Sequence, residues 1–395
     1  MKNGKLVITA LVLSVMVLAL IILESFDIRP GVAESAVSAS GGAAGDAGTG
    51  DGGQQQGETV PRTPVYEFDL KYTKYLVTAP YEYEAGGETR RFKFDEMVRA
   101  AETAYEAAKS GTIAYIDNYK NRNGMAPKND GRTVDDLGNS RSASAPGYYD
   151  SSGSGDFRYI ADGTLVSVVS ENEKFAEVRI VGETDGRSYF VPEHYVPAED
   201  ALVSLEKVIV VDRAQQNIAA FERVPELVIE PVSINTDAID PSEFVNIDLM
   251  ECAADGMTEG AMPAAFPGGR AEWKIVSYSL ATTGKNGKYH QPTPLGYYFA
   301  IEKKPKFYYL KDGTNDIEGY APYAIRFTAG AYVHGVAVPY KYTAEGVRVD
   351  PGMQEFSRSI GTVPLSHKCV RNYTSHAKFL YDWYEHGKTV VIVIE

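Results

Sequence analysis

The sequence predicts a mainly β protein built from more than one domain. Short apolar segments separated by turn residues recur along its second half, where only one convincing helical pattern occurs. The composition agrees, because 27 tyrosines and an aromatic content of 11% favour strands. At 395 residues the chain is too long for a single ordinary hydrophobic core, so two or three domains are expected.

The first predicted element is a membrane anchor. An uncharged apolar run from Leu6 to Leu23 follows Lys2 and Lys5. As a helix this run would be roughly 27 Å long, enough to cross the hydrocarbon core of a bilayer. The two lysines predict that the N-terminus stays inside and that the rest of the chain lies outside the membrane. A cleaved signal peptide is the alternative, although the run is long for one. We expect residues 1–24 to form a single-pass anchor in the cell membrane.

Three segments of less regular sequence follow. From Gly31 to about Pro64 the sequence is Gly, Ala, Ser, Asp and Gln with hardly an aromatic or branched residue, so we expect residues 25–64 to be a disordered linker. Residues 65–130 form an uncertain α/β segment, in which 94–109 has the spacing of an amphipathic helix and Gly111 follows as a stop signal. Residues 131–156 are rich in Gly, Ser, Asn and Asp and are expected to be a loop.

Residues 157–203 contain short strand patterns at close spacing. Turn pairs Asp162-Gly163 and Asp185-Gly186 separate the strands expected at 165–169, 175–181 and 188–191. Together with the closing sequence YFVPEHYV (189–196), this segment resembles a bacterial SH3-like module. An unrelated β-meander is the alternative.

Residues 204–395 are expected to form a second β-rich domain. An acidic, irregular insertion at 225–269 interrupts it. One helix is expected at 375–384, directly after a cysteine. The predicted strands are 208–211, 218–221, 273–280, 296–301, 323–327, 331–333 and 389–394.

Charge and cysteine content exclude several function classes. Asp+Glu 53 against Lys+Arg 39 gives a net charge of −14, which argues against a nucleic-acid-binding protein. Two cysteines do not make a disulfide framework, and the six histidines show no four-ligand metal spacing. We therefore predict no metal and no organic cofactor.

The most informative stretch is SHKCVRN, residues 366–372. A lone cysteine is ordinarily a small buried apolar residue. Here Cys369 has a histidine two residues before it, a lysine beside it and an arginine two residues after it. Imidazoles and cations stabilise the thiolate, which is the reactive form in nucleophilic catalysis.

Two further motifs give this cysteine a context. Thr293-Pro294-Leu295-Gly296 and the stretch Gly330 to Gly335, which contains His334, precede it in the chain. Together the three stretches resemble the L,D-transpeptidase catalytic domain, the YkuD family, over residues 204–395. The resemblance implies a β-rich domain with one helix after the catalytic cysteine, acting on peptidoglycan in cell wall biogenesis.

The resemblance implies catalytic roles for four residues. Cys369 would be the nucleophile and His334 the proton donor and acceptor, a duty suited to a neutral imidazole. The carbonyl of Gly335 would orient the ring of His334. On an extended segment His367 points the same way as Cys369, so it would support the thiolate or the oxyanion.

Four more residues are expected to bind substrate. Arg371 is the candidate anchor for a substrate carboxylate, with an ordinary surface ion pair as its alternative. Gly330 would allow close approach of the substrate, and Ser366 completes the site. Lys368 stands where the family normally has glycine. It would be strained if the site needs a positive φ; otherwise its ammonium would lower the thiol pKa or meet a substrate carboxylate.

These residues predict a peptidoglycan L,D-transpeptidase that forms cross-links, or attaches wall proteins, through a thioester. An L,D-carboxypeptidase is the close alternative, and a catalytically impaired peptidoglycan-binding protein is the alternative from another class. The expected partners are stem peptides of peptidoglycan, the membrane through the N-terminal helix, and carbapenems that react with Cys369. Residues 335–365 separate His334 from Ser366, longer than in the family pattern, so we expect a lid near 338–355.

Overall fold

The computed structural model describes residues 63–74, 77–127, 131, 133–135, 138–197, 202–225 and 272–395. They lie within one compact unit, residues 61–395. No helix in this part of the chain is long and apolar enough to span a membrane. The apolar run at 6–23, nearly all of the linker at 25–64 and nearly all of the insertion at 225–269 lie outside the described residues.

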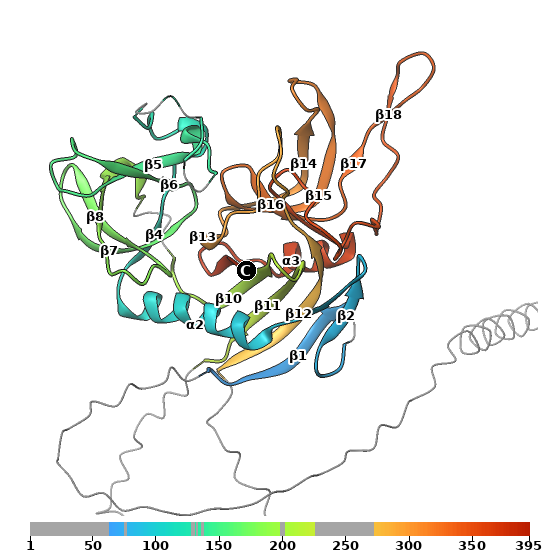
Figure 1. Ribbon diagram of the computed structural model, residues 1–395, viewed down its shortest axis with the longest axis horizontal. Helices are drawn as coiled ribbons and strands as arrows, with labels where there is room; N and C mark the ends of the chain where they lie inside the picture. The colour runs from blue at the N-terminus through green and yellow to red at the C-terminus, as the bar shows by residue number, and fades with distance from the viewer. Residues whose placement is uncertain are drawn as a thin grey trace, which may run out of the picture. The chain divides into compact units, whose positions relative to one another are not determined.

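The largest sheet confirms the mainly β prediction (Figure 1). Among the described residues it has eleven strands in the order β13-β21-β10-β11-β12-β20-β16-β15-β14, with β1 beside β12 and β17 beside β15. Its strands are β1 (Tyr66–Thr73), β10 (Lys207–Asp212), β11 (Asn217–Arg223), β12 (Trp273–Thr282), β13 (Gly296–Phe299), β14 (Glu302–Leu310), β15 (Ile317–Thr328), β16 (Ala331–His334), β17 (Val338–Pro339), β20 (Val370–Asn372) and β21 (Thr389–Ile394).

The inner strands of this sheet place side chains in two hydrophobic cores, one on each face. On β10, Val208 and Val210 join one core, while Ile209 and Val211 join the core on the opposite face. Residues 390–393 of β21 alternate in the same way. A sheet buried on both faces needs continuous apolar strands, which explains why these segments show no polar alternation in the sequence.

Each core contains one helix. α2 (Phe94–Ser110) packs Met97, Ala101 and Ala104 into the first core, and α3 (Thr374–Trp383) packs Leu380 into the second. Both helices occur where the apolar spacing predicts them. Gly111, after α2, has φ 178°, so it is extended and not left-handed.

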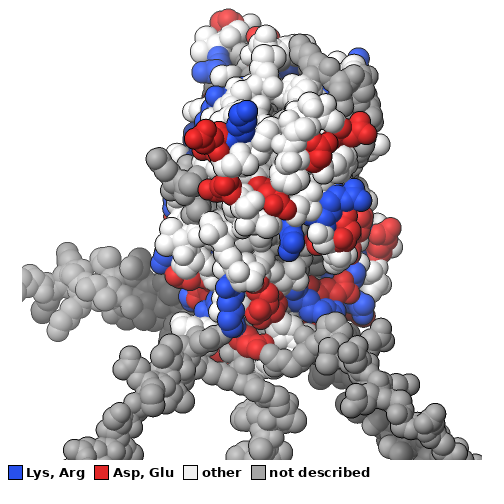
Figure 2. All heavy atoms as spheres, turned by 90° about the vertical axis from the view of Figure 1, so that its left-hand side faces the viewer, with Lys and Arg blue, Asp and Glu red and all other residues white. Residues whose placement is uncertain are grey.

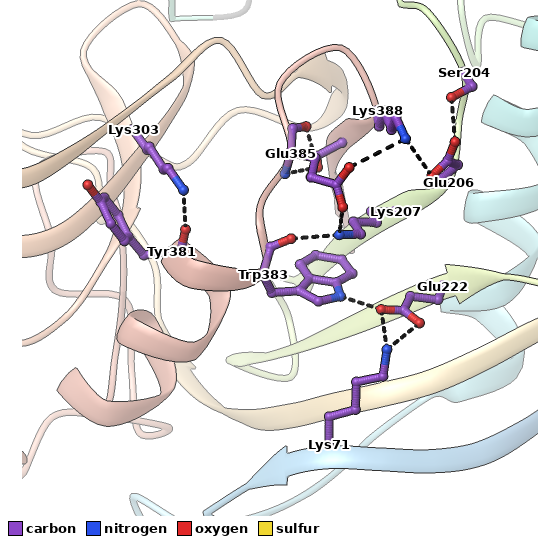
Figure 3. Close-up of polar contacts among 11 residues, drawn as sticks. Lys71, Ser204, Glu206, Lys207, Glu222, Lys303, Tyr381, Trp383, Glu385 and Lys388 are labelled. Atoms are coloured by element: carbon purple, nitrogen blue, oxygen red, sulfur yellow. Dashed lines mark hydrogen bonds and ion pairs between the residues drawn. The ribbon is translucent and has the colours of Figure 1, made fainter.

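Polar contacts hold the end of α3 against the central sheet (Figure 3). Lys207 Nζ donates to the carbonyl of Trp383 at 2.9 Å and pairs with Glu385. Trp383 Nε1 donates to Glu222 Oε1 at 2.6 Å, and Lys71 of β1 pairs with the same carboxylate at 2.6 Å. Strands β1, β10 and β11 thereby fix the helix that directly follows the cysteine stretch.

The segment at 65–130 is not a separate unit. β1 pairs in parallel with β12, with Tyr66 opposite Trp273, and α2 covers the same sheet. β1 and α2 therefore share a sheet and a core with strands that lie beyond residue 204. Partners so distant in sequence leave no local pattern that would predict this pairing.

A second sheet of six strands lies upstream, in the order β4-β7-β8-β9-β5-β6. Its strands are β4 (Ile113–Tyr115), β5 (Ser144–Tyr148), β6 (Phe157–Ala161), β7 (Leu165–Glu171), β8 (Phe175–Ile180) and β9 (Tyr189–Pro192). β5 lies in the segment that was expected to be a loop, yet it pairs with β6 along its whole length. The sequence did not indicate this strand because Pro146 and Gly147 are both unfavourable in strands. The sheet thus extends beyond residues 157–203, and its SH3-like character stays a prediction.

The surface beside this sheet carries mixed charge. Figure 2 views the side that lies at left in Figure 1, where acidic and basic side chains are interspersed. Ion pairs such as Arg158–Glu183 at 2.8 Å join neighbouring parts of the sheet.

The long insertion after β16 forms β17 and a hairpin of β18 (Lys341–Tyr342) and β19 (Arg348–Val349) that extends away from the central sheet (Figure 1). Its end contacts the first turn of α3. The backbone N–H of Ser375 donates to Glu355 Oε2 at 2.9 Å, and that of Thr374 donates to the Glu355 carbonyl at 3.1 Å. A carboxylate at this position stabilises a helix N-terminus.

Candidate active site

Cys369 lies immediately before β20, inside the central sheet. β20 pairs in parallel with β16, and the register places His334 opposite Arg371. On its other side β20 pairs with the end of β12, where Thr282 is opposite Arg371. The chain enters α3 at Thr374. The cysteine is therefore held between two strands and a helix that starts just after it.

The thiol of Cys369 is nearly buried, with 8% of the residue exposed. Its Sγ donates to the carbonyl of Gly330 at 3.7 Å. Burial raises the pKa of the thiol, and the backbone N–H of Tyr332 and the charges on Arg371 and Lys368 only partly oppose that shift. Cys369 is consequently a protonated thiol at neutral pH in the free protein.

His334 is buried, lines the same pocket as Cys369 and is neutral. Its Nδ1 lies 2.6 Å from the carbonyl oxygen of Gly335, which can only accept, so Nδ1 carries the proton and Nε2 is the basic atom. Burial and the charge of Arg371 lower the pKa of His334 to about 3. A Cβ on Gly335 would lie 2.9 Å from Thr374 Oγ1, so glycine allows this tight approach.

Cys369 and His334 line one pocket of about 340 Å³. Its lining residues are Tyr119, Lys120, Phe307, Tyr308, Tyr309, Leu310, Ala321, Gly330, His334, Ala337, His367, Lys368, Cys369 and Arg371. Six of the eight predicted site residues are among them. None of residues 338–355 lines the pocket, so the insertion expected to be a lid instead supports α3.

Thr293, from the motif at residues 293–296, stabilises the turn that precedes Cys369. Thr293 Oγ1 donates to the carbonyl of Lys368 at 2.9 Å and accepts from the backbone N–H of Gly284 at 2.8 Å. A Cβ on Gly284 would lie 2.2 Å from the carbonyl oxygen of Gln291 and 2.9 Å from Cα of Lys368. The three sequence motifs thus meet around one nucleophile.

Residues 260–393 match the L,D-transpeptidase catalytic domain family, YkuD. The resemblance predicted from the three motifs is therefore confirmed over this range. A comparison with curated protein sequences gave no significant match.

Solved structures similar to this chain include several L,D-transpeptidases. An enzyme from Mycobacterium tuberculosis H37Rv is 15% identical, covers 64% of this chain and 76% of its own, and has a TM-score of 0.28. An L,D-transpeptidase from Mycobacterium smegmatis is 16% identical, covers 58% and 82%, and has a TM-score of 0.28. L,D-transpeptidase 3 from Mycobacterium tuberculosis, with a faropenem-derived adduct, is 18% identical, covers 60% and 92%, and has a TM-score of 0.27.

Lys368, within the region that matches the YkuD family, is accommodated without a left-handed backbone. It is absent from the residues with positive φ, so it carries none of the strain considered from the sequence. Its side chain is buried, and Nζ donates to Asn139 Oδ1 at 2.8 Å. Burial lowers the pKa of its ammonium to about 8, opposed by the charges of Asp135, Cys369 and Asp162. The cation therefore points toward the upstream region and still favours the thiolate.

His367 is engaged on the outer side of the cysteine turn. The chain bends at residues 367 and 368, so the alternation of an extended strand does not apply there. His367 Nε2 lies 2.7 Å from Asp312 Oδ1, and its ring stacks on His290 with centroids 4.0 Å apart. The imidazole lines the pocket, but its Nε2 is bonded to Asp312 instead of serving Cys369.

Ser366 and Gly330 play different parts. Ser366 is fully buried, its hydroxyl donates to the carbonyl of Cys369, and it is not among the residues that line the pocket. A Cβ on Gly330 would meet no atom within 4 Å. The backbone of Gly330 is therefore open to a ligand in the pocket.

Arg371 is a cation of the pocket that has no ion-pair partner among the described residues. Its Nε is buried and has no hydrogen-bond partner among the described residues, and none of their carboxylates forms an ion pair with it. The surface ion pair considered from the sequence is thus not found in this part of the chain. An unpaired guanidinium in a pocket matches a carboxylate ligand.

A group that the sequence did not reveal could hold a metal. His290, Asp312 and His367 each offer one ligand atom, and these atoms lie within 4.8 Å of one another. His290 and His367 are far apart in the chain, so the sequence shows no metal-ligand spacing that would have predicted this site.

Sequence reasoning also missed the upstream wall of the pocket. Tyr119 and Lys120 line it, although they precede the YkuD match by more than a hundred residues. Phe307 to Leu310, at the end of β14, form a further part of the lining. A Tyr-Lys pair in an irregular segment has no distinguishing signal of its own.

Proposed function

We propose that this chain is a peptidoglycan L,D-transpeptidase that acts through a thioester on Cys369. The observation that carries the proposal is the neutral pair formed in one pocket by the thiol of Cys369 and the fixed imidazole of His334, beside the unpaired Arg371. The match to the L,D-transpeptidase catalytic domain supports this choice among acyl-transfer reactions.

In the first half-reaction His334 Nε2 accepts the proton of Sγ as the sulfur attacks the carbonyl carbon of the donor peptide bond. The C–N bond then breaks, His334 returns the proton to the departing amine, and a thioester remains. In the second half-reaction an acceptor amine attacks the thioester and gives its proton to His334. The amide forms, the sulfur leaves, and His334 returns the proton to Sγ.

Arg371 favours these two half-reactions in two ways. Its charge lies close enough to lower the pKa values of both the thiol and His334, so it stabilises negative charge at the reacting centre. Its unpaired guanidinium is suited to hold a donor carboxylate. The same chemistry predicts acylation by carbapenems, which are electrophilic amides with a carboxylate.

Location belongs to the same proposal. The apolar run at 6–23 would tether the catalytic part outside the membrane, where peptidoglycan lies.

The decisive experiment is mass spectrometry of the protein after incubation with a disaccharide tetrapeptide. Cys252 is the other of the two cysteines in the sequence, so Cys252→Ala is the matched control. The wild type and Cys252→Ala should gain the acyl mass on Cys369 and release the terminal D-residue. Cys369→Ala should do neither, and His334→Ala should acylate at least a hundredfold more slowly. Release of the D-residue by Cys369→Ala would overturn the proposal. Adding an acceptor amine separates cross-linking from hydrolysis to the tripeptide.

A further inference from the structure

One wall of the active-site pocket comes from outside the YkuD match. The 3-10 helix η1 (Tyr119–Asn121) follows β4 of the upstream sheet, and its Tyr119 and Lys120 line the pocket with Cys369. Among the described residues, the lining contains three cations, Lys120, Lys368 and Arg371, and no carboxylate. A protein of net charge −14 thus presents a cationic pocket to its ligand.

A single buried carboxylate fixes this wall to the reaction centre. Asp162, in the turn between β6 and β7, accepts from the backbone N–H of Asn118 at 3.0 Å, just before η1. It also accepts from the N–H of Ala329 at 3.0 Å, just before Gly330. Arg326 pairs with the same carboxylate at 2.6 Å, and neither side chain is more than 3% exposed.

The same arginine supports Tyr119 directly. The guanidinium carbon of Arg326 lies 4.4 Å from the centroid of the Tyr119 ring, within the range of a cation–π contact. Because Gly330 accepts from Cys369 Sγ, Asp162 and Arg326 connect both sides of the pocket through a few short contacts. The upstream wall is therefore preorganised, not a loose neighbour.

Lys120 has the properties of a ligand-binding residue. Its φ of 55° places it in the left-handed region, which costs a non-glycine residue about 1 kcal/mol. The side chain is exposed, its Nζ lies 5.1 Å from the centroid of the Tyr119 ring, and it forms no ion pair with a described residue. Strained backbone that presents a free cation to a pocket is typical of functional sites.

We propose that Tyr119 and Lys120 form a second carboxylate subsite, alongside Arg371, for the peptide that acylates Cys369. This rests on the proposed function. A donor stem offers more than one carboxylate near the scissile bond, and two unpaired cations in one pocket match two such groups. The ring of Tyr119 would pack against the apolar part of the same residue.

The test compares acylation rates of Cys369 by a tetrapeptide with free carboxylates and by analogues amidated at one carboxylate at a time. Lys120→Ala should slow acylation by the free acid about tenfold. It should leave unchanged the rate of the one analogue that lacks the carboxylate bound by Lys120. Lys120→Arg should retain most of the wild-type rate. The matched control is Lys174→Ala, an exposed lysine before β8 outside the pocket.

The outcomes separate the subsite from the proposed function. Equal slowing of the free acid and every amidated analogue, or no slowing at all, overturns the subsite. Alkylation of Cys369 by iodoacetamide reports the thiol alone and should be unaffected by Lys120→Ala. If iodoacetamide labels the wild type while no stem peptide acylates it, the proposed function fails and the subsite fails with it.

A separate observation concerns the rim of the pocket. His290, Asp312 and His367 come from three different loops, and their ligand atoms lie within 4.8 Å of one another. The two imidazoles are stacked at an interplanar angle of 13°, and Nε2 of His367 lies 2.7 Å from Asp312 Oδ1. Imidazole nitrogens and carboxylate oxygens are both common metal ligands.

We propose that these three residues bind a divalent transition metal, for which two imidazoles and one carboxylate suit Zn²⁺. Small rotations of side chains that are not fully buried would bring the ligand atoms to Zn–N and Zn–O distances near 2.1 Å. The ion would tie the turn of Cys369 to the loop that follows β14. This metal site does not depend on the proposed reaction of Cys369.

Calorimetric titration of Zn²⁺ into full-length Cys369→Ala tests this site without interference from the catalytic thiol. One saturable site is expected, at least tenfold weaker when His290→Ala or Asp312→Asn is added. His194→Ala, outside the cluster, is the matched control and should bind as the parent does. Absence of saturable binding, or full binding in the His290→Ala protein, overturns the site.

Discussion

At the scale of single residues, the chemistry of this protein is set by burial. Burial raises the pKa of the Cys369 thiol and lowers the pKa of His334, and both shifts favour the uncharged form. The resting pair is therefore a thiol and a neutral imidazole, not a thiolate and an imidazolium. In the proposed reaction, proton transfer would therefore accompany the attack of sulfur on the substrate.

This resting state predicts the pH dependence of thiol alkylation. In Cys252→Ala protein, the rate of Cys369 alkylation by iodoacetamide should rise about tenfold per pH unit from pH 7 to 9, because the thiolate fraction grows throughout that range. The measurement is the rate constant against pH, followed by intact mass. A plateau that begins below pH 8 would show a preformed thiolate and contradict the neutral pair.

The lysine beside the nucleophile gives a second prediction. Lys368→Gly should not increase the acylation rate, because Lys368 has no left-handed backbone to relieve. Loss of its charge should instead slow alkylation of Cys369 at pH 7.5 by a few-fold, since that charge lowers the thiol pKa. Lys368→Arg keeps the charge and serves as the control. A faster Lys368→Gly enzyme would mark lysine as an impairing residue.

At the scale of elements, the site depends on a short turn held from outside. Residues 366–369 form no regular structure, yet Thr293 bonds to the carbonyl of Lys368, and Ser366 bonds to that of Cys369. α3 then fixes the downstream side through its contacts with Glu355 and the central sheet. The position of Cys369 is therefore fixed by the hydrogen bonds of Thr293 and Ser366 and by the contacts of α3.

Thr293→Val tests the main support. Valine keeps the shape of threonine but leaves the N–H of Gly284 and the carbonyl of Lys368 without their buried partner. We expect a loss of about 1–3 kcal/mol in the free energy of unfolding, measured by urea denaturation. Thr293→Ser retains the hydroxyl and should lose less. Equal losses in the two variants would assign the effect to packing instead.

At the scale of the whole molecule, the sequence predicted what is local and missed what joins distant segments. Strands with apolar runs, such as 208–211 and 389–394, and the helix after Cys369 carry their signal in adjacent residues. The reacting pair was found because motifs surround it. The link from Lys368 to Asn139 and the wall formed by Tyr119 arise only when separate sheets meet, and no periodicity encodes such a meeting.

The junction between the two sheets predicts a pH-dependent stability. Burial raises the pKa of Asp162 to about 6, although Arg326 opposes the shift. Since this exceeds the value of roughly 3.9 for an exposed aspartate, the stability that the group contributes is fully present below pH 4 and is lost as the pH rises through 6.

Asp162→Asn removes that titration. The free energy of unfolding of the wild type, relative to the variant, should therefore fall by about 2 kcal/mol between pH 4 and pH 7.5. Urea denaturation of both proteins at the two pH values gives this difference. A constant difference would show that Asp162 does not titrate between them.

The position of β21 bears on when the protein can fold. This last strand lies between β13 and β10, and it pairs in parallel with β10, whose residues are synthesised much earlier. Until residues 389–394 emerge, β10 lacks one neighbour and β13 lacks its partner in the sheet. We expect the central sheet to be completed only after this segment is translated. Its formation should be slow because β10 and β21 are far apart in the sequence.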